Sequence, residues 1–511
     1  MRELRIEVLD EGSALRLVDA AGTPLGRRSL APGEIDALVD EVATAYDTRA
    51  PDLARLGRRL FDWLDGSGQR WLSSQMAELR NEGLTLRLGV GHRLRHLPWE
   101  LAAGADGLLA ASVTRPFCPV REVVTAGGGW EAANRPLRAL FMAASPENVS
   151  PLLDYEAEEV RILAAAGAGG VELVVEEQGS LAGLRQRLRD HEAGWCDVMH
   201  LTGHADVSAS GVPHLLMETD TGRLDRVDAD RLIEAVEGRW PRVTFVSGCR
   251  TGAAPDGGLL PSFAEQLVAA GAPCVIGWGH PVGDIAATTL AAALYEQLGV
   301  GERVDAAIAR ARLALLRSNS NDWHLLRAYA DASSLGPLVS APATVGRPRL
   351  RIRRADVEFL DANAQRPVCS HDRFVGRRRL LQRSLRTLTT TDQADSAYAE
   401  GVLLHGMGGL GKSSAAARLC ERLGDYRRLV WVGELDDIEL ARVVGEQFGA
   451  AAGAILNQPG LDTRQRVRAC WRASPSQSCS SSTTSSATSR AKPMASHAST
   501  PRAGPWSSPQ P

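Results

Sequence analysis

The sequence predicts an α/β protein whose main domain is a mostly parallel β-sheet flanked by helices. Short apolar runs alternate with helical segments between residues 136 and 337, and another strand–loop–helix pattern begins near residue 401. Alternation of buried strands with helices is typical of parallel sheets, because each crossover between parallel strands needs a connection of about helix length.

Bulk composition excludes several classes of protein. The 511 residues allow two or three domains, and 44% hydrophobic residues with a net charge of −3 are ordinary for a globular chain. We therefore expect neither a nucleic-acid partner nor a membrane partner. The N-terminal residues contain no uninterrupted apolar stretch, which predicts neither a signal peptide nor a membrane span. The eight cysteines form no C-x-x-C pair, which favours reduced thiols and a cytoplasmic location.

The chain divides by composition into five predicted segments. Residues 1–130 form a small α/β lobe, with a strand pair over the first 22 residues, an amphipathic stretch at 53–64, a strand at 84–90 and the run HLPWEL at 96–101. Residues 131–336 form the core, with strands expected at 137–143, 171–175, 198–201, 243–246 and 274–278 and helices at 155–166, 181–191 and 262–270. A linker at 337–370, a second α/β unit at 371–469 and a disordered Ser/Thr/Pro-rich tail at 470–511 follow.

A histidine and a cysteine follow two of the predicted core strands. His204 comes just after the strand in DVMHLTGHAD, and Cys249 comes just after the strand in VTFVSGCRTG. Chemistry in open α/β sheets gathers beyond the carboxyl ends of the strands, so we expect both side chains at one edge. They are 45 residues apart, close to the roughly 50 expected in caspases. An imidazole beside a thiol can take its proton and make it a nucleophile.

These segments resemble the CHAT domain, a branch of the caspase-like cysteine peptidases. The matching pieces, in order, are LPWEL (97–101), DVMHLTGHAD (197–206), VTFVSGCRTG (243–252) and GAPCVIGWGHPVGD (271–284). The resemblance implies a caspase-like sheet, a catalytic dyad of Cys249 and His204, and endopeptidase activity on a protein substrate. It also implies an oxyanion hole made by the backbone amides of Ala205 and Cys249.

One residue departs from the pattern, since these peptidases usually have glycine where this chain has Ala205. If that position needs a positive φ, strain would weaken the oxyanion hole. The alternative reading is therefore a catalytically inactive, peptidase-like signalling scaffold that binds ATP.

Other residues near the dyad have open roles. Arg250, with Ser247, is a candidate for the substrate pocket; Arg250 would then favour an acidic residue before the scissile bond, or else it faces solvent or pairs with Asp256. His200 is a less favoured candidate for the base, and His280 for lining the cleft. Two acidic residues, Asp197 and Asp206, are candidates for orienting His204, and the spacing does not choose between them. Cys196 and Cys274 are expected to be packing residues.

A phosphate-binding loop is predicted in the second unit. A strand at 401–405 leads into the pattern G-x-x-x-x-G-K-S, followed by a helix over 414–423. The expected nucleotide-binding residues are Gly406, Gly408, Gly409, Gly411, Lys412, Ser413 and Ser414. In this reading Lys412 reaches the phosphates of ATP and Ser413 coordinates Mg²⁺.

The same glycines also fit G-x-G-x-x-G, with Glu434 after the next strand at 429–432, as a dinucleotide site requires. The lysine favours ATP, because only two of the 58 basic residues are lysines and one of them, Lys412, stands where a compact ammonium is needed. The segment FVGRRRLLQRSLRTL (374–388) with GMGGLGKSS resembles signalling NTPases of the NB-ARC type, which implies a nucleotide-dependent switch and, in a complete domain, an oligomerisation surface.

The C-terminal segment lacks the second NTPase motif, an apolar strand that ends in acidic residues. No acidic residue follows Asp462. The octet CSSSTTSS at 479–486 can be encoded by codons that spell Leu-Leu-Val-Leu-Asp-Asp-Phe-Glu in an adjacent frame. We therefore expect either a frameshift near Ala469 that truncates the NTPase segment or a natural Ser/Thr-rich tail, and negligible ATP hydrolysis in both cases.

Overall fold

The computed structural model shows two units, Met1–Ile352 and Arg353–Pro511. The described residues are 1–46, 48, 51–66, 68, 70–79, 81–125, 128–147, 149–150, 158, 160–162, 164, 170–248, 262–341, 358–360, 364, 366–370, 374, 376–390, 401–423, 430, 436–448 and 450–473. Within this described part, every helix is too short or too polar to span a bilayer.

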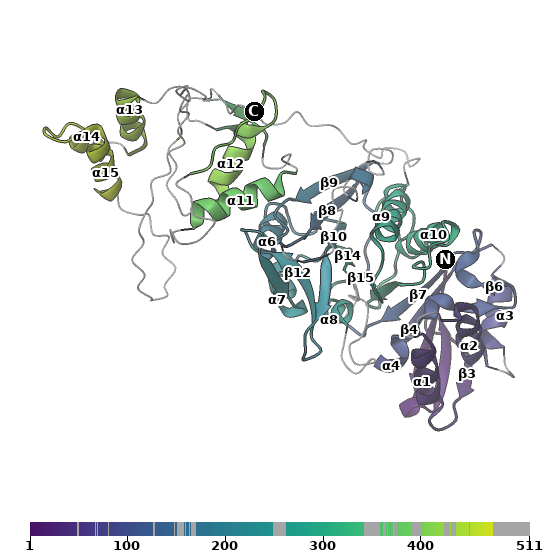
Figure 1. Ribbon diagram of the computed structural model, residues 1–511. Coiled ribbons are helices and arrows are strands. Elements are labelled where there is room, and N and C mark those ends of the chain that lie inside the picture. The colour runs from purple at the N-terminus through teal and green to yellow at the C-terminus, as the bar shows by residue number, and fades with distance from the viewer. Residues whose placement is uncertain are drawn as a thin grey trace, which may run out of the picture. The chain divides into compact units, whose positions relative to one another are not determined.

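An eleven-stranded sheet organises the first unit (Figure 1). Its strand order is β3-β2-β1-β4-β7-β16-β15-β14-β10-β8-β9. The bounds of these strands are β1 Arg2–Leu9, β2 Ala14–Asp19, β3 Pro24–Ser29, β4 Leu84–Gly89, β7 Phe117–Glu122, β8 Leu137–Ala143, β9 Val171–Glu176, β10 Val198–Thr202, β14 Val243–Ser247, β15 Cys274–Trp278 and β16 Leu326–Ala330.

Most neighbours in this sheet are parallel, which confirms the predicted mostly parallel sheet of the main domain. Strands β9, β8, β10, β14 and β15 run in one direction. The direction reverses at β16, which is antiparallel to β15 and parallel to β7, and β7, β4 and β1 continue in that sense. The predicted N-terminal strand pair is the antiparallel pair β1–β2.

Two hydrophobic layers separate along β10, because successive side chains of a strand point to opposite faces. Met199 and Leu201 belong to one layer, and Val198 belongs to the other. The first layer contains the helices α6 (Leu181–Arg189), α7 (Ala229–Val236) and α8 (Phe263–Ala269), and the second contains α9 (Asp284–Gly299) and α10 (Val304–Arg317). The central strands read as continuous apolar runs because both of their faces are covered.

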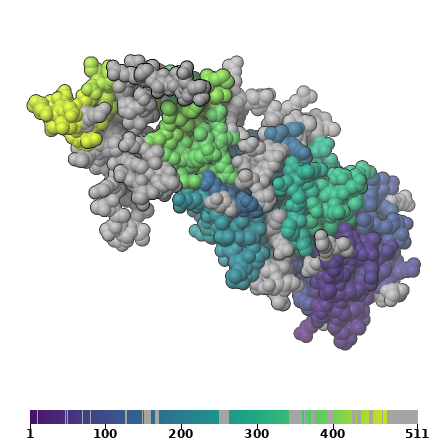
Figure 2. All heavy atoms as spheres, viewed as in Figure 1, coloured from purple at the N-terminus to yellow at the C-terminus, as the bar shows by residue number. Residues whose placement is uncertain are grey.

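The N-terminal elements complete the second layer. Their bounds are η1 Asp10–Gly12, α1 Glu34–Tyr46, α2 Leu53–Asp65, α3 Trp71–Glu78, α4 His92–Arg95, η2 Trp99–Leu101, β5 Ala103–Gly104, β6 Gly107–Leu108 and η3 Leu109–Ala111. The predicted amphipathic stretch is α2, whose N-cap Asp52 accepts a hydrogen bond from the Arg55 N–H and whose apolar side chains from Leu56 onward are buried. Figure 2 shows α9 and α10, in green-teal, against the purple and blue N-terminal elements.

A buried charge cluster connects the LPWEL segment to the sheet and to α10. The Glu100 carboxylate accepts hydrogen bonds from Arg121 at 2.7 and 2.9 Å and from Arg312 at 3.3 Å. All three side chains are buried. Burial alone would raise the pKa of Glu100, but Arg121 holds it below its ordinary value. Since unpaired buried charges cost several kcal/mol each, this cluster strongly favours one arrangement of η2, β7 and α10.

The second unit has five described helices and one two-stranded sheet. They are α11 Arg378–Thr389, α12 Lys412–Arg422, α13 Asp437–Phe448, α14 Ala450–Leu456, α15 Thr463–Ala473, and the strands β17 Glu358–Phe359 and β18 Pro367–Val368. Leu381 and Leu385 of α11 pack against Leu419 of α12. The predicted strand at 429–432 and the tail beyond 473 lie outside the described residues, apart from residue 430.

The strand predicted at residues 401–405 is wrong. These residues form neither strand nor helix, and the Leu403 side chain is 71% exposed. A strand exists only by pairing with a neighbour, and no strand pairs with this segment in the described part of the chain. An apolar run followed by a glycine loop was therefore not sufficient to predict a buried strand.

Candidate functional site

The parallel pair β10–β14 creates the edge at which the site was predicted. Thr202, the last residue of β10, lies opposite Ser247, the last residue of β14. Just past the strand end, the Gly203 N–H donates a hydrogen bond to the Ser247 carbonyl at 3.3 Å. The two chain segments that leave these strands therefore start side by side at the same edge of the sheet.

The predicted nucleophile follows β14 closely. Cys249 and its neighbour Arg250 fall in residues 249–261, which lie outside the described part of the chain. Gly248 is the last described residue before them.

His204 begins a small antiparallel sheet at this edge. The sheet contains β11 (His204–Val207), β12 (Pro213–Glu218) and β13 (Leu224–Val227). His204 itself is half-buried. Gly203, between β10 and β11, packs closely against the neighbouring chain, since a Cβ there would lie 3.3 Å from the Ala144 carbonyl oxygen and 3.5 Å from the Ala144 Cβ.

Ala205 adopts ordinary strand geometry. It lies within β11, opposite Leu215 of β12. It is not among the residues with positive φ in the described part of the chain. The strain considered for a non-glycine residue at this position is therefore absent.

The two acidic candidates lie at opposite ends of the strand that leads to His204. Asp197 precedes β10, where its carboxylate pairs with Arg135 and accepts the Arg138 N–H. Seven residues of extended chain, about 20 Å, separate Asp197 from His204. Asp206 lies within β11, and its carboxylate contacts Arg226 at 3.0 Å. Only Asp206 is on the same side of the sheet edge as His204.

His200 lies in the core and not at the edge of the sheet. Its imidazole is completely buried, stacked on Phe245 with ring centroids 4.4 Å apart and edge-on to Phe141. Burial lowers the pKa of His200 to about 3. The Glu158 carboxylate lies 3.5 Å from Nε2, and burial raises the pKa of Glu158 to about 7. His200 is therefore a buried, neutral packing residue and does not lie at the predicted catalytic edge.

Comparison with protein families gives a result that agrees with this arrangement. A family model of the CHAT domain matches residues 54–369, more than half of the chain. The chain belongs to the CHAT domain family. No curated protein matches the sequence.

The solved structures that are similar to this chain include two of the separase–securin complex from Saccharomyces cerevisiae. One is 13% identical over 59% of this chain and 22% of that chain, with a TM-score of 0.30. The other is 12% identical over 58% and 23%, with a TM-score of 0.29. The chain thus spans less than a quarter of the chains it matches there. Caspase-1 from Spodoptera frugiperda is 8% identical over 44% of this chain and 98% of that chain, with a TM-score of 0.28.

Two other residues that were predicted to lie near the site have structural contacts. The Ser247 hydroxyl accepts a hydrogen bond from the Trp278 indole N–H at 3.2 Å and is buried. The His280 ring lies edge-on to the Tyr46 ring at 5.0 Å. Ser247 therefore helps to join β14 to β15, and His280 contacts the end of α1.

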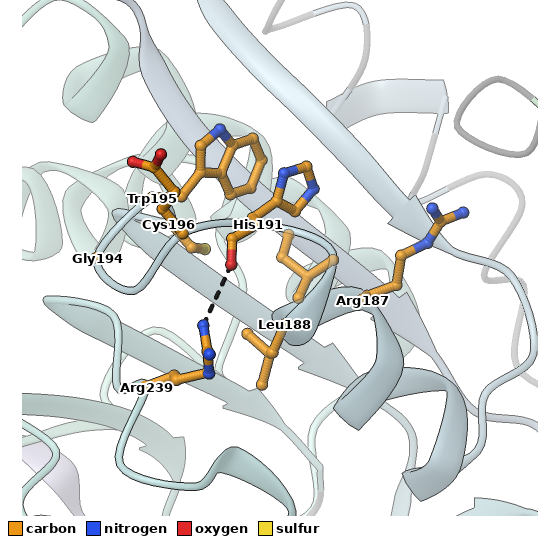
Figure 3. Close-up of a pocket in the computed structure, with 9 residues that line it drawn as sticks. Arg187, Leu188, His191, Gly194, Trp195, Cys196 and Arg239 are labelled. Atoms are coloured by element: carbon orange, nitrogen blue, oxygen red, sulfur yellow. Dashed lines mark hydrogen bonds between the residues drawn. The ribbon is translucent and has the colours of Figure 1, made fainter.

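A small pocket of the CHAT domain lies beside α6 and the turn before β10 (Figure 3). It is lined by Leu140, Arg187, Leu188, His191, Glu192, Gly194, Trp195, Cys196 and Arg239. Arg239 donates to the His191 carbonyl at 3.1 Å across it. Burial raises the pKa of the Cys196 thiol to about 12 and raises that of Cys274 as well. Both thiols are held as packing groups and not as nucleophiles.

The glycine loop of the second unit has a conformation that glycine favours. Gly406, Gly409 and Gly411 have φ values of 137°, 76° and 71°, and α12 begins at the next residue, Lys412. The Lys412 ammonium donates to the Gly406 carbonyl at 2.9 Å and to the Met407 carbonyl at 2.6 Å. The lysine side chain is thus folded over the loop.

The two serines after Lys412 differ in their surroundings. The Ser414 hydroxyl accepts a hydrogen bond from the Cys369 N–H at 2.9 Å, which ties α12 to the segment after β18. Ser413 is half-buried. A structural contact therefore already occupies the Ser414 hydroxyl.

Sequence reasoning missed one cluster of chemically active side chains. His92, His96 and Glu265 have ligand atoms within 4.8 Å of one another. The i, i+4 spacing of the two histidines on a short helix was a usable signal. Their carboxylate partner was not recognisable, because it lies 173 residues from His92.

The role of His200 can be tested by its effect on pH-dependent stability. His200 stays neutral in the folded protein but binds a proton below about pH 6.5 when unfolded, so folding stability decreases as the pH falls below that value. We expect the free energy of unfolding of His200→Leu, relative to that of wild type, to increase by about 2 kcal/mol between pH 8 and pH 5. Urea unfolding of both proteins at the two pH values measures this difference, and an equal change in both would show that His200 is accessible to protons.

Proposed function

We propose that the chain is a caspase-like cysteine endopeptidase of the CHAT type, with Cys249 as the nucleophile and His204 as the general acid and base. The observation that carries the proposal is the pairing of Thr202 with Ser247, which starts both functional segments at one edge of the sheet.

Chain geometry limits how far apart the two groups can be. Adjacent strands lie about 4.8 Å apart, and consecutive Cα atoms are about 3.8 Å apart. Both His204 and Cys249 come two residues after the paired residues Thr202 and Ser247. Each is therefore within about 7.6 Å of its strand end, a spacing at which an imidazole and a thiol can meet.

The reaction would proceed in two balanced steps. His204 takes the proton from the Cys249 thiol, and the thiolate attacks the carbonyl carbon of the scissile bond. The imidazolium then gives its proton to the departing amine as the C–N bond breaks, leaving a thioester. In the second step His204 deprotonates a water molecule that attacks the thioester, and the thiol is regenerated as the second peptide leaves with a free carboxylate.

Backbone amides of Ala205 and Cys249 are the proposed donors to the oxyanion that forms in both steps. The strand geometry of Ala205 supports its part, since an alanine presents the same N–H as glycine in an extended conformation. Arg250 is the proposed specificity residue, through a bidentate pair with an acidic side chain before the scissile bond.

A covalent probe tests the nucleophile. We expect a thiol-directed peptidyl probe to label the full-length protein at Cys249, as identified by peptide mass spectrometry. Cys249→Ala should abolish this label and lower peptide cleavage by at least about a thousandfold, because removing a nucleophile removes the covalent route. Cys420→Ala, which removes a half-buried thiol in α12, is the matched control and should retain both.

Two outcomes would contradict the proposal. Cleavage that persists in Cys249→Ala would exclude this nucleophile. Labelling of Cys249 without cleavage of any member of a diverse peptide library would favour the inactive scaffold. With an active enzyme, the same library tests the preference for acidic residues.

We further propose that residues 406–414 bind ATP with Mg²⁺ and that the bound nucleotide regulates the peptidase. The support is the positive φ of three loop glycines and the start of α12 at Lys412. Backbone N–H groups at the start of a helix favour phosphate. Phosphate oxygens would replace the two carbonyls that Lys412 now contacts, and Ser413 would coordinate the Mg²⁺.

Nucleotide binding can be measured with matched variants. In titrations followed by calorimetry we expect Lys412→Ala to weaken Mg-ATP binding at least tenfold, because the ammonium neutralises phosphate charge. Ser413→Ala should weaken binding only when Mg²⁺ is present, whereas Ser414→Ala should have a smaller effect, since its hydroxyl is bonded to Cys369. Equal affinity in wild type and Lys412→Ala, or no binding by wild type, would contradict the proposal.

A further inference from the structure

Two histidines and one carboxylate from distant parts of the chain converge beside α8. His92 lies on α4, and His96 caps that helix. His92 Nδ1 lies 3.2 Å from one Glu265 carboxylate oxygen, Oε1, and His96 Nε2 lies 2.7 Å from the other, Oε2. The two imidazole rings are edge-to-face with centroids 4.7 Å apart. All three ligand atoms are thus directed toward one small volume.

We propose that His92, His96 and Glu265 form a binding site for a divalent transition-metal ion, with Zn²⁺ as the ion that matches these ligands best. Two imidazoles and one carboxylate are a known ligand set for Zn²⁺. Tetrahedral coordination at about 2.05 Å requires ligand atoms about 3.3 Å apart. His92 Nδ1 and His96 Nε2 each lie within 3.2 Å of one of the two Glu265 carboxylate oxygens, and one ligand atom from each of the three residues lies within 4.8 Å of the other two. Side-chain rotations that shorten the longest of these separations by about 1.5 Å would bring the three atoms to the tetrahedral spacing.

Surrounding groups already orient the ligands. The Tyr329 hydroxyl lies 3.2 Å from His96 Nδ1. The Ser262 N–H donates to Glu265 Oε2 at 2.9 Å. Metal-binding histidines usually have such a partner on their second nitrogen, and metal-binding carboxylates are themselves hydrogen-bonded.

Binding requires one proton to change its position on His96. Without an ion, Nε2–H donates to the Glu265 carboxylate and Nδ1 accepts from Tyr329. With an ion, the Nε2 lone pair binds the metal, and the proton moves to Nδ1 and is donated to the Tyr329 oxygen.

Arg95 opposes binding through its positive charge, and the charge of Arg327 also acts on His96. The Arg95 guanidinium donates to Glu265 Oε1 at 2.7 Å and to the Val90 carbonyl at 3.0 Å. An ion on Oε2 leaves both of these bonds intact, and the guanidinium then shares the carboxylate with the metal. We therefore expect a moderate affinity that increases when the Arg95 charge is removed.

The site is open to solvent and linked to the predicted catalytic segment. The His92 side chain is 28% exposed, so an ion can enter and a water molecule can complete its coordination. Glu265 lies in the first turn of α8, which starts directly after residues 249–261. A bound ion would fasten the start of α8 to α4. This inference does not depend on peptidase activity.

Cobalt is a direct probe of the site, because tetrahedral Co²⁺ has intense visible absorption. The protein would be the full chain without an affinity tag, carrying Cys249→Ala so that this thiol cannot bind the ion, and stripped of metal by a chelator. We expect one Co²⁺ per chain with tetrahedral absorption bands, and displacement of Co²⁺ by Zn²⁺. Competition with a chromophoric chelator gives the affinities.

His92→Ala is the decisive variant, because its partly exposed side chain can be removed with little effect on the core. We expect it, and His96→Gln, to weaken Zn²⁺ binding at least tenfold, and Arg95→Gln to strengthen it. His191→Ala, which removes a histidine stacked on Trp195, is the control and should bind as the parent does. Parent affinity in a folded His92→Ala protein, or absence of tetrahedral bands in the parent, would overturn the proposal, whatever the stability of His96→Gln.

Discussion

Parallel pairing of β10 with β14 is the constraint on which the site depends. The pairing sets Thr202 opposite Ser247, and the Gly203 N–H extends it past the strand end. A shift of one residue would exchange the two faces of β10. His200 would then leave the layer of Phe141 and Phe245, which it contacts, for the layer on the other face. The hydrophobic layers on the two faces therefore determine the register, and the register sets the ends of the two strands that precede His204 and Cys249 side by side.

Buried polar groups further restrict how the helices and strands pack. Glu100 with Arg121 and Arg312 connects the LPWEL segment to β7 and α10, and the Ser262–Glu265 capping box starts α8 next to α4. Such groups tolerate few alternative arrangements, because an unpaired buried polar group destabilises the fold by more than a surface contact stabilises it.

Much of the fold could be predicted because its signals are local. The apolar runs at 137–143 and 274–278 coincide with β8 and β15, and the helix predicted at 262–270 is α8 with its two caps. Contacts between segments that are far apart in the sequence could not be predicted. Nothing in Leu326–Ala330 indicates that β16 enters between β15 and β7 in the reverse sense. The run at 401–405 has strand composition without a described partner, and His92 gives no sign of Glu265. The positions of His204 and Ala205 followed from the strand before them, whereas their small antiparallel sheet did not.

The central claim, that His204 activates Cys249, is tested most directly by the pH dependence of alkylation at Cys249. The rate of reaction with iodoacetamide, followed by mass spectrometry of the Cys249 peptide, reports the thiolate fraction at each pH. If His204 pairs with this thiol, the wild type should titrate with an apparent pKa below about 7.5, and His204→Ala should return it to the ordinary value of about 8.5. Identical profiles for the two proteins would contradict the account.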